Sequence, residues 1–433
     1  MSTIRSWGRL SAEPHDDIEL DRSDRIAQLI TEGPFPGLAH GMGRSYGDVC
    51  LNPKGSLWLT RGLDRFIQWD ERTGRMTCEA GVRLRDIQKL MVPRGWMLPV
   101  TPGTQWVSVG GAIANDIHGK NHHLLGSFGH HVHTLTLVRT DGETIVCGPQ
   151  KNSDWFFATI GGLGLTGVIS QAELQLRPVK GPWLETETIA YESLEDFFFL
   201  SKSSEPDWEH SVSWIDCLYG GGGRGLFMRA NPYALNLHTE KKGIPLSMPF
   251  TPPFSMVNSV TLRPFNFLYY HLNARKTGQK LVHYEPFSYP LDNLNEWNRM
   301  YGPRGFYQYQ SVVPLSAGLE ATRAMLKAIK NANEGSFLAV LKTFGNKASQ
   351  GMLSFPMPGV TLALDFPNRG ERTQRLFRQL DAIVSEAGGR LYPAKDARMP
   401  KDLFQAGYPQ LSQFRSFRDP GISSGFSRRV MGD

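Results

Sequence analysis

A short glycine-rich pattern near the N-terminus has the spacing of a nucleophile site. Residues 43–47 read GRSYG, which matches the G-x-S-x-G elbow that presents a reactive serine in α/β-hydrolases. That elbow requires a helix directly after the serine, but Pro53 and Gly55 follow and would stop a helix. A hydrolase, in which Ser45 would react with a serine-directed phosphonate, is therefore disfavoured.

A second pattern, GLGLTG at residues 162–167, has the G-x-G-x-x-G spacing of dinucleotide-binding loops. A Rossmann turn needs a strand before the glycines and a helix after them. Here residues 153–159 are predicted to form a helix with Ser153 as its N-cap, and residues 168–176 are predicted to form a strand. Because this order is reversed, we do not expect a Rossmann domain. The glycines still allow a ligand to approach the backbone closely.

A cluster of histidines is the third candidate for chemistry. Six of the 12 histidines lie between His118 and His133, and His118, His122 and His123 could imitate the spacing of metal ligands. Asp116 is the only acidic residue beside them, and glycines break the segment, so no helix face would gather the ligands. We expect hydrogen-bonded loop histidines and no metal site. A metal-binding scaffold without flavin is the alternative from another functional class.

Glycine-rich turns recur through the first part of the chain. They lie at residues 41–47, 102–104, 110–111 and 161–167. Each presents backbone N–H groups without hindrance from a side chain, and several such turns together could cradle a pyrophosphate and a flat ring. The residues alone thus predict a site for a large phosphorylated cofactor.

The elements that must position these turns are short. Periodicity predicts strands at residues 56–60, 76–80, 212–216, 225–228, 305–313, 337–344 and 361–366, a hairpin at residues 133–147, and helices at residues 82–90, 319–332 and 371–387. Residues 245–270 are rich in Pro, Phe, Met and Tyr but have no helical or strand period. They are expected to form either a packed irregular loop or an apolar flap that faces a membrane. The sum is an α+β fold.

Composition narrows the class of protein. The chain has 433 residues, a formal net charge of +6 and four cysteines without C-x-x-C spacing. No segment has the length of a transmembrane helix or the pattern of a signal peptide, so we expect a cytoplasmic protein, at most peripheral at the inner face of a membrane. The charge suits an anionic substrate or membrane surface, and no motif indicates nucleic-acid binding.

The glycine motifs, taken with their neighbours, resemble a known family. The series GMGRSYGD, PGTQWVSVGGAIANDIHGKNHH, GSFGHHV and GGLGLTG resembles the FAD-binding domain of the vanillyl-alcohol-oxidase/p-cresol-methylhydroxylase (VAO/PCMH) type. The similarity to the decaprenylphosphoryl-β-D-ribose 2-oxidases of that type extends through EWNRMYGPRGFYQYQ, LKTFG, LSFPMPG and GGRLYPAKDAR. It therefore covers nearly the whole chain, and the combination of IHGKNHH with RLYPAKD is specific.

The resemblance implies a two-domain VAO/PCMH-type flavoprotein. Residues 1–182 would form the FAD-binding domain, and residues 183–389 a substrate domain with an antiparallel sheet flanked by helices. Residues 390–433 would return to the FAD domain. These boundaries agree with a proline-bearing joint at residues 177–182 and with Gly388 and Gly389 after the last long helix.

The resemblance also implies an activity. Such enzymes use FAD to oxidise the 2-hydroxyl of a polyprenyl-phosphoryl ribose to the 2-keto sugar. A partner NAD(P)H-dependent keto-reductase then completes the epimerisation to the arabinose donor for cell-envelope arabinan. The alternative is an FAD-dependent oxidase of free sugars, alditols or aldonolactones, which would not require the phospholipid tail.

Matched positions suggest which residues hold the cofactor. Many relatives with covalent FAD place a histidine where this sequence has Arg44, so the resemblance implies noncovalent FAD. The expected cofactor contacts are Gly41, Met42, Gly43, Arg44, Ser45, Tyr46, Gly103, Thr104, Gly110, Gly111, Ala112, Asn115, Ile117, His118, Gly119, Gly162, Gly164, Gly167 and Tyr392.

The catalytic residues implied by the resemblance are Lys395, His118 and Tyr46. Lys395 would hold the substrate oxygen or stabilise negative charge on the reduced flavin. The expected substrate contacts are Tyr301, Gln308, Gln310, Lys342 and Lys395.

Structural interpretations stay open beside these roles. Gln308 and Gln310 could be a solvated strand face, Lys342 a surface lysine and His118 a purely structural histidine. Lys395 could pair with Asp396 or Asp365.

The sequence departs from the family pattern at two places. The ending DPGISSGFSRRVMGD is looser than the usual one, which leaves the role of the last fifteen residues open. Ala363 stands where some relatives carry a cysteine, which removes a nucleophile but no catalytic group.

Overall fold

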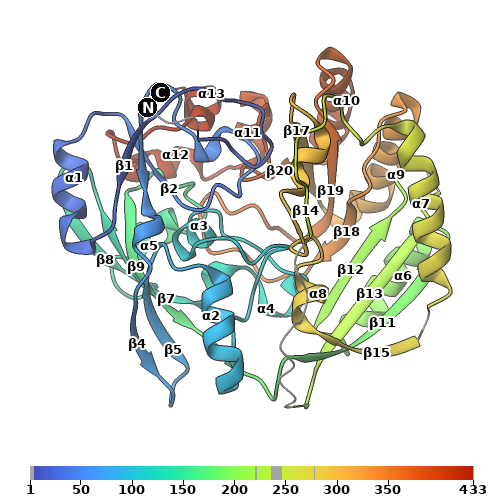
Figure 1. The fold of residues 1–433 in the computed structure, drawn as a ribbon, viewed down its shortest axis with the longest axis horizontal. Helices are drawn as coiled ribbons and strands as arrows, with labels where there is room; N and C mark the ends of the chain where they lie inside the picture. Colours follow the sequence, from blue (N-terminus) through green and yellow to red (C-terminus); the bar gives the residue numbers. More distant parts are fainter. Residues whose placement is uncertain (1–3, 220–221, 236–245, 277, 433) are drawn as a thin grey trace.

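Two β-sheets stand side by side in the computed structural model, which describes residues 4–219, 222–235, 246–276 and 278–432 (Figure 1). The first sheet is five-stranded, antiparallel and built from the early part of the chain. Its order is β4 (Phe66–Asp70), β5 (Arg75–Glu79), β9 (Val168–Gln175), β7 (Val132–Val138) and β8 (Thr144–Cys147). A parallel three-stranded sheet joins it, with the order β1 (Asp16–Glu19), β3 (Ser56–Leu59) and β2 (Gly37–His40).

Short helices and turns complete this first part. They are α1 (Ile26–Glu32), α2 (Leu84–Met91), α3 (Val109–Ala114), α4 (His122–Leu125), α5 (Ser153–Thr159) and the two-residue strands β6 (Trp96–Met97) and β10 (Arg177–Pro178). The hairpin expected at residues 133–147 is formed by β7 and β8. The helix at residues 153–159 is also present, but its N-cap is Asn152 and not Ser153, because the chain enters the helix through a left-handed Asn152.

The second sheet is eight-stranded and antiparallel throughout. Its order is β15 (Gly278–His283), β11 (Trp183–Tyr191), β13 (Gly225–Tyr233), β12 (His210–Ile215), β18 (Ala339–Phe344), β19 (Gly359–Pro367), β17 (Phe306–Val313) and β20 (Arg390–Leu391). Nearby lie α8 (Tyr284–Ser288) and a parallel pair formed by β14 (Leu246–Ser247) and β16 (Leu294–Asn295).

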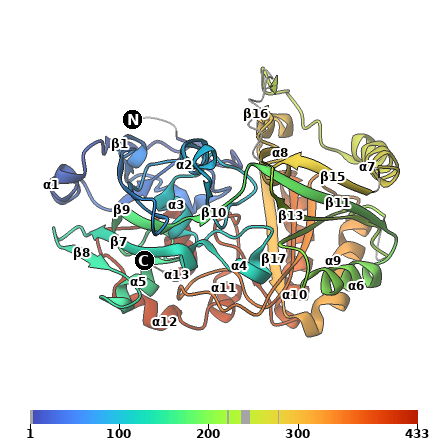
Figure 2. The ribbon, with the colours of Figure 1, turned by 90° about the horizontal axis from the view of Figure 1, so that it is seen from below.

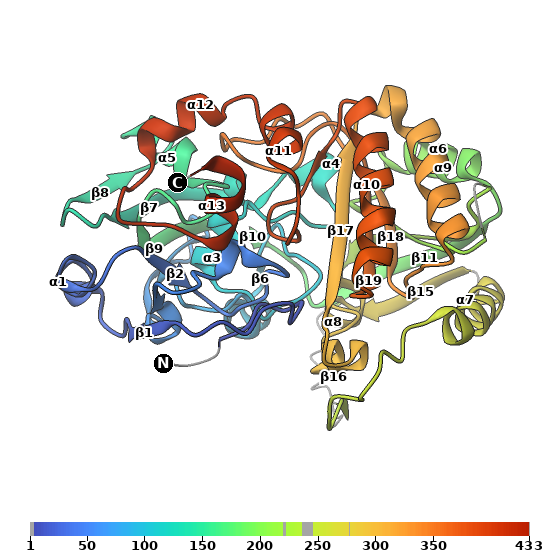
Figure 3. The same cartoon turned by 90° about the horizontal axis from the view of Figure 1, so that it is seen from above.

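Helices cover the two faces of the second sheet unequally. One face packs against α6 (Leu194–Ser204), α9 (Leu315–Ala332) and α10 (Glu371–Glu386), as Figures 2 and 3 show. Phe377 of α10 contacts the rings of Tyr309 and Phe366 there. On the opposite face, among the described residues, α7 (Ser259–Ala274) packs over β11 and β13, with Tyr270 in one hydrophobic cluster with Trp214 and Leu226. The remaining part of this face is directed toward the first sheet.

Residues 245–270 differ from the expected irregular segment, apart from Pro245, which lies outside the described residues. Asn258 caps α7 through a capping box with Thr261, and the helix accommodates Pro264. Its buried residues recur at helical spacing, but its outer face is also apolar. With both faces apolar, the helix has no amphipathic period to read in the sequence.

The chain finally returns to the first part through α11 (Lys401–Gly407), α12 (Leu411–Phe414) and α13 (Gly425–Met431). The N–H of Gly37 donates to the carbonyl of Gly421 at 2.9 Å, and the N–H of Thr140 donates to Asp419 at 2.8 Å. Arg429 binds both Asp48 and Asp396. These contacts fasten the end of the chain to its beginning.

None of the helices in the described ranges is both long and apolar enough to cross a bilayer.

Candidate active site

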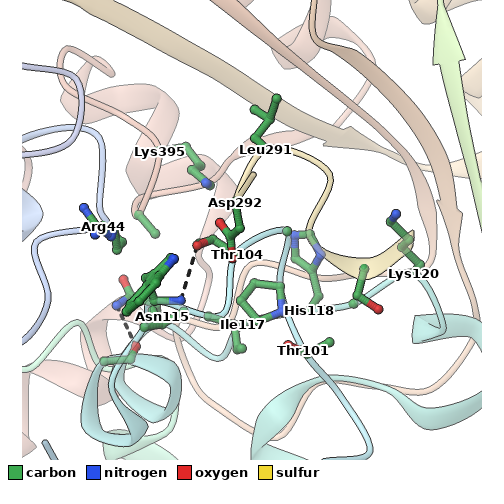
Figure 4. A pocket seen from close by; sticks show the side chains of 18 of the residues that line it. Arg44, Thr101, Thr104, Asn115, Ile117, His118, Lys120, Leu291, Asp292 and Lys395 are labelled. Carbon is green, nitrogen blue, oxygen red and sulfur yellow. Dashed lines mark hydrogen bonds between the residues drawn. The ribbon is translucent and has the colours of Figure 1, made fainter. Parts of the chain in front are cut away.

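A cavity of about 810 Å³ lies between the two sheets. The glycine-rich loops of the first part form one wall, and the pleated face of the eight-stranded sheet forms the other. A space of this size can enclose a cofactor together with part of a second ligand. In Figure 4, Arg44 and Lys395 lie on one side of the cavity and Lys120 on the other, with His118 between them.

The first glycine loop has the donors that an anion needs. Among the described residues, the N–H groups of Gly43, Arg44 and Ser45 have no protein acceptor. The turn at Gly110 and Gly111 differs from expectation, because its N–H groups already donate to Ala80 O at 2.7 Å and Ser108 Oγ at 3.3 Å. These two glycines therefore provide space for a ligand and no free donors.

Empty space and unpaired polar atoms on this wall fit a bound FAD. A Cβ built on Gly103 or Gly164 would meet no atom within 4 Å, so both backbones border open space. In the described part of the chain, Arg44 Nε and the buried Asn115 Oδ1 have no hydrogen-bond partner. Unpaired buried polar groups are costly unless a ligand satisfies them. The guanidinium of Arg44 lies 4.3 Å from the Trp7 ring, which orients it toward this space.

A buried carboxylate fixes the loop that carries His118. Asp116 accepts hydrogen bonds from Ser127 Oγ at 2.8 Å, from the Gly129 N–H at 2.8 Å and from Ser354 Oγ at 2.6 Å. Its backbone is left-handed, with a φ of 39°. Burial raises the pKa of this carboxyl, while the three donors act in the opposite direction. The anchored Asp116 thus sets the position of the next residues.

Both ring nitrogens of His118 are engaged. Lys342 Nζ lies 2.8 Å from Nδ1, and the amide of Gln310 lies 3.1 Å from Nε2. Burial and then the Lys342 charge hold the pKa of His118 well below its usual value, so the ring is neutral. The amide atom facing His118 is Gln310 Nε2, which also donates to Thr361 Oγ1 at 3.2 Å. With Lys342 donating to Nδ1, the ring proton belongs on Nε2 and two N–H groups would face each other, so we assign the flipped Gln310 amide, whose oxygen accepts from the ring.

Lys342 lies inside the site and is not a surface lysine. It is 8% exposed, and its Nζ also donates to the carbonyl of Gly119 at 2.8 Å. Burial, followed by the charges of Lys120 and Lys395, lowers the pKa of Lys342 to about 7. Burial likewise lowers the pKa of Lys120 to about 8. The cavity therefore gathers cations that a phosphate would stabilise.

Lys395 faces the cavity from the turn after β20. Its Nζ lies 4.1 Å from the centre of the Tyr46 ring. Among the described ion pairs none joins Lys395 to Asp396 or Asp365; Asp396 pairs with Arg429 at 2.9 Å instead. Burial lowers the pKa of Lys395, and the Asp365 charge partly offsets that effect.

Tyrosines close the site. The hydroxyl of Tyr392 donates to the Asn115 carbonyl at 2.9 Å, and its ring stacks on Phe355. The backbone N–H of Tyr46 donates to the Ala394 carbonyl at 3.0 Å, which ties the first glycine loop to the Lys395 turn. Burial raises the pKa of both phenols well above the usual value, so both stay protonated.

Most of the residues expected at the site lie on the cavity wall. These are Gly41, Met42, Gly43, Arg44, Ser45, Tyr46, Gly103, Thr104, Gly110, Gly111, Asn115, Ile117, His118, Gly119, Gly164, Gly167, Gln308, Gln310, Lys342, Tyr392 and Lys395.

Three expected residues lie behind the wall. Tyr301 is 2% exposed and stacks on Phe306 at 4.1 Å, within the hydrophobic core. Ala112 is buried on the inner side of α3, and a Cβ on Gly162 would approach the Ala158 carbonyl to 2.2 Å. Any effect of these residues on a ligand is therefore indirect.

The residues missed as site residues include the charged wall residues Lys120 and Asp292 and the buried carboxylate Asp365. Lys120 follows the Gly119 turn, and the sequence placed it inside the motif IHGKNHH. Asp365 accepts from Gln308 Nε2 at 2.6 Å, and alternation along β19 could have placed it on the cavity side. Asp292 accepts from the Gln105 N–H at 2.9 Å from an irregular segment that gave no signal.

The other clustered histidines mostly bind loops together. His123, His130 and His131 contact the carbonyls of Trp208, Ala348 and Leu125 at 2.9 to 3.0 Å. Within the described ranges, no three His, Cys, Asp or Glu residues gather as metal ligands.

Comparisons with known proteins agree with this geometry. A family model described as an FAD binding domain matches residues 21–148. The decaprenylphosphoryl-β-D-ribose oxidase of Mycolicibacterium smegmatis is 35% identical over 99% of this chain and 97% of its own length.

Partial similarity extends to lactone oxidases. A putative D-arabinono-1,4-lactone oxidase of Neurospora crassa is 32% identical over 41% of this chain and 31% of its own length. The L-gulonolactone oxidase of Mus musculus is 31% identical over 32% of this chain and 31% of its own length. Of these three relatives, the first matches nearly the whole of both chains, and the other two match less than half of either. The chain is an FAD-dependent oxidoreductase that acts on CH–OH groups, and it belongs to the family of decaprenylphosphoryl-β-D-ribose oxidases.

Proposed function

We propose that this oxidoreductase converts the 2-hydroxyl of a polyprenyl-phosphoryl ribose to a 2-keto group. The observation that carries the proposal is the cation cluster of Lys342, Lys120 and Lys395, which shares one cavity with the glycine-lined cofactor wall. A phosphodiester between sugar and lipid would offset the charges of Lys342 and Lys120, whereas a free sugar would bring no negative charge to them. The family relationship supports the same substrate class.

The residues divide the chemical work among them. When bound, FAD would supply the acceptor for the hydride of carbon 2. Lys395 Nζ takes the hydroxyl proton, because its lowered pKa leaves a neutral fraction near neutral pH. The ammonium so formed is stabilised by the Tyr46 ring and by Asp365. His118 stays neutral and, with Gln310, positions the sugar, while Lys342 binds the phosphate.

We further propose that FAD is bound noncovalently, with Arg44 and the free N–H groups of its loop on the pyrophosphate. Acid precipitation of the purified protein tests this point. The flavin absorbance is expected in the supernatant. A flavin that stays in the pellet would show a covalent bond and contradict the role given to Arg44.

The substrate class is tested by mixing the oxidised enzyme with defined sugars. Geranylgeranyl-phosphoryl ribose is expected to bleach the flavin under anaerobic conditions, while ribose, alditols and aldonolactones are not. Bleaching by the free sugars with equal efficiency would support the alternative oxidase. The 2-keto product would then be the substrate of an NAD(P)H-dependent keto-reductase, which completes epimerisation to the arabinose donor for cell-envelope arabinan.

We also propose that α7 and the strand beside it contact a membrane surface. Val260, Phe267, Leu268 and Leu272 are all more than half exposed on α7. Residues 246–284 contain no acidic residue, and their lysines and arginines are Arg263, Arg275, Lys276 and Lys280. An exposed apolar face flanked by positive charge is typical of interfacial helices on anionic membranes.

The division into a cofactor domain (residues 1–182), a substrate domain (183–389) and a returning segment (390–433) is part of the same proposal. The strands of the five-stranded sheet all come from residues 1–182, which supports this division. One detail qualifies it: β20 begins the returning segment but pairs with β17 of the eight-stranded sheet.

A further inference from the structure

The cavity extends beyond the cation cluster along the open face of the eight-stranded sheet. Alternate residues of neighbouring strands face it, and the register aligns them across the sheet. Thr188 pairs with Met228, Met228 with Val212, and Trp214 with Val340. All five line the cavity, as does Leu338. The result is a continuous strip across four strands, and none of its six side chains is charged.

The strip joins the cation cluster at one end. Lys342 lies two residues after Val340 on β18, so both side chains point to the same face. A ligand with a phosphate at Lys342 would therefore meet only uncharged side chains if it continued along this strip.

Helix α7 lies over the strip at Trp214 of β12 and also contacts the two farther strands, β13 and β11. Tyr269 of α7 lines the cavity, and its ring lies 4.8 Å from the ring of Trp214. On the same helix, Leu268 and Leu272 are exposed to the outside. An apolar path thus continues from the sheet face to the apolar outer surface of α7.

Four of the six side chains of the strip are not packed as a core would be, whereas Val212 and Trp214 are each 5% exposed. Thr188, Met228, Leu338 and Val340 keep intermediate exposure although they lie on a sheet face that is turned inward. On the opposite face of the sheet, Phe227 and Leu341 are at most 1% exposed. Apolar side chains that border a cavity without filling it are typical of a ligand site.

We propose that this strip, from Val340 to Thr188, binds the first isoprene units of the lipid chain of the substrate. The phosphate lies at Lys342, and the chain runs across the sheet and leaves beneath α7. This inference rests on the proposed function, because it assumes a phosphate-linked polyprenyl substrate. It adds a binding site for the lipid chain and a direction in which the chain leaves.

The experiment tests the proposed lipid site by placing a bulky tryptophan side chain in the strip. Thr188→Trp fills the β11 end of the strip, which the chain passes before it leaves beneath α7, and Glu185→Trp is the control on the same strand with its side chain on the opposite face. Thermal unfolding of both holoenzymes verifies that they fold. The substrates are ribosyl phosphodiesters that carry an ethyl, geranyl or geranylgeranyl group, compared by kcat/KM. Binding of geranyl and geranylgeranyl phosphate without a sugar is measured separately by titration calorimetry.

The expected results follow from the value of burying methylenes, each worth about a fourfold change in affinity. In the wild type and in Glu185→Trp, kcat/KM should rise at least tenfold from the ethyl to the geranylgeranyl substrate. Thr188→Trp should lose most of that rise, and geranylgeranyl phosphate should bind it at least tenfold more weakly. Equal chain-length dependence in Thr188→Trp and wild type would overturn the proposal, as would a wild type indifferent to chain length.

Failure of the proposed function gives a different result. If the wild type oxidises none of the ribosyl phosphodiesters, the substrate assignment is wrong. Binding of the prenyl phosphates then decides the lipid site alone. Chain-length-dependent binding that Thr188→Trp abolishes supports the strip, and binding that it leaves unchanged rejects it.

Discussion

At the scale of single residues, burial lowers the pKa values of the basic side chains in the site and so determines which of them are charged. Lys342 and His118 share a hydrogen bond in a region where burial disfavours both charged forms, so the ring is neutral and the ammonium is easily lost. The charged groups facing Lys342 are Lys120 and Lys395, and both are cations. An anionic ligand would offset these positive charges.

This balance predicts a pH dependence. Because the pKa of Lys342 is lowered to about 7, the ammonium is present below that pH and is lost above it. Lys395 must be neutral to take the proton and its pKa is lowered to about 8, so activity should first rise with pH. We expect kcat/KM for a phosphorylated substrate to be bell-shaped in pH, with the alkaline fall caused by loss of the Lys342 ammonium, and Lys342→Met to be at least tenfold less active with that fall absent. Lys347→Met, at an exposed position five residues away, should keep the wild-type profile. An identical fall in Lys342→Met would assign the titration to another group.

A second prediction concerns Asp116. Asp116→Ala leaves the N–H of Gly129 and the hydroxyls of Ser127 and Ser354 without their acceptor in a buried place. We expect a loss of about 3 kcal/mol in the free energy of unfolding. Asp116→Asn, which keeps one oxygen for Gly129, should lose less. Urea unfolding of the three proteins compares them, and equal stability of Ala and Asn variants would contradict the role of the carboxylate oxygens.

At the scale of elements, the sequence predicted most of the regular helices and strands but little about the irregular segments. Each element with one buried face shows a clear period of apolar residues in the sequence. This period predicted the strands at residues 305–313 and 361–366 and the helix at residues 371–387. Helix α7 was missed because its inner face meets the sheet and its outer face is also apolar. Asp292 lies in an irregular segment, where no spacing rule connects it to the Gln105 N–H.

The outer face of α7 leads to the third prediction. Leu268→Glu combined with Leu272→Glu adds two negative charges to an exposed face, so the fold should be retained. Co-sedimentation with vesicles that contain anionic phospholipid should fall at least fivefold. Leu315→Glu, an exposed leucine on α9 across the sheet, is the matched control and should co-sediment like the wild type. Undiminished co-sedimentation of the α7 variant would locate the membrane contact elsewhere.

At the scale of the whole molecule, the cavity exists only because distant segments meet. The motifs that carried the family resemblance include residues on both walls, and Lys395 faces Tyr46 across a sequence separation that no local pattern could reveal. Resemblance therefore named site residues that periodicity could not. It also named Tyr301, Ala112 and Gly162, which lie behind the wall, because a motif match does not say which of its residues face the cavity.

Arg429 connects the two sides of this arrangement. It binds Asp48, which follows the first glycine loop, and Asp396, which follows Lys395. Arg429→Met leaves two carboxylates without their cation, so we expect a loss of about 3 kcal/mol in stability and weaker FAD binding. Thermal unfolding with and without added FAD, and an FAD titration of the apoprotein, measure both effects. Arg428→Met, which removes hydrogen bonds to Asn52 and Ser423 but no ion pair, is the comparison.

The return of the chain to its start has a consequence for biosynthesis. The ribosome releases the first glycine loop long before the turn with Lys395 and the helix with Arg429, yet Tyr46 donates its N–H to Ala394. During translation the five-stranded sheet can form before the turn with Lys395, which borders the cofactor cavity, has been synthesised. Flavin is thus expected to be captured only after the segment with Lys395 and Arg429 has been synthesised, and a nascent chain truncated before Lys395 should emerge without it.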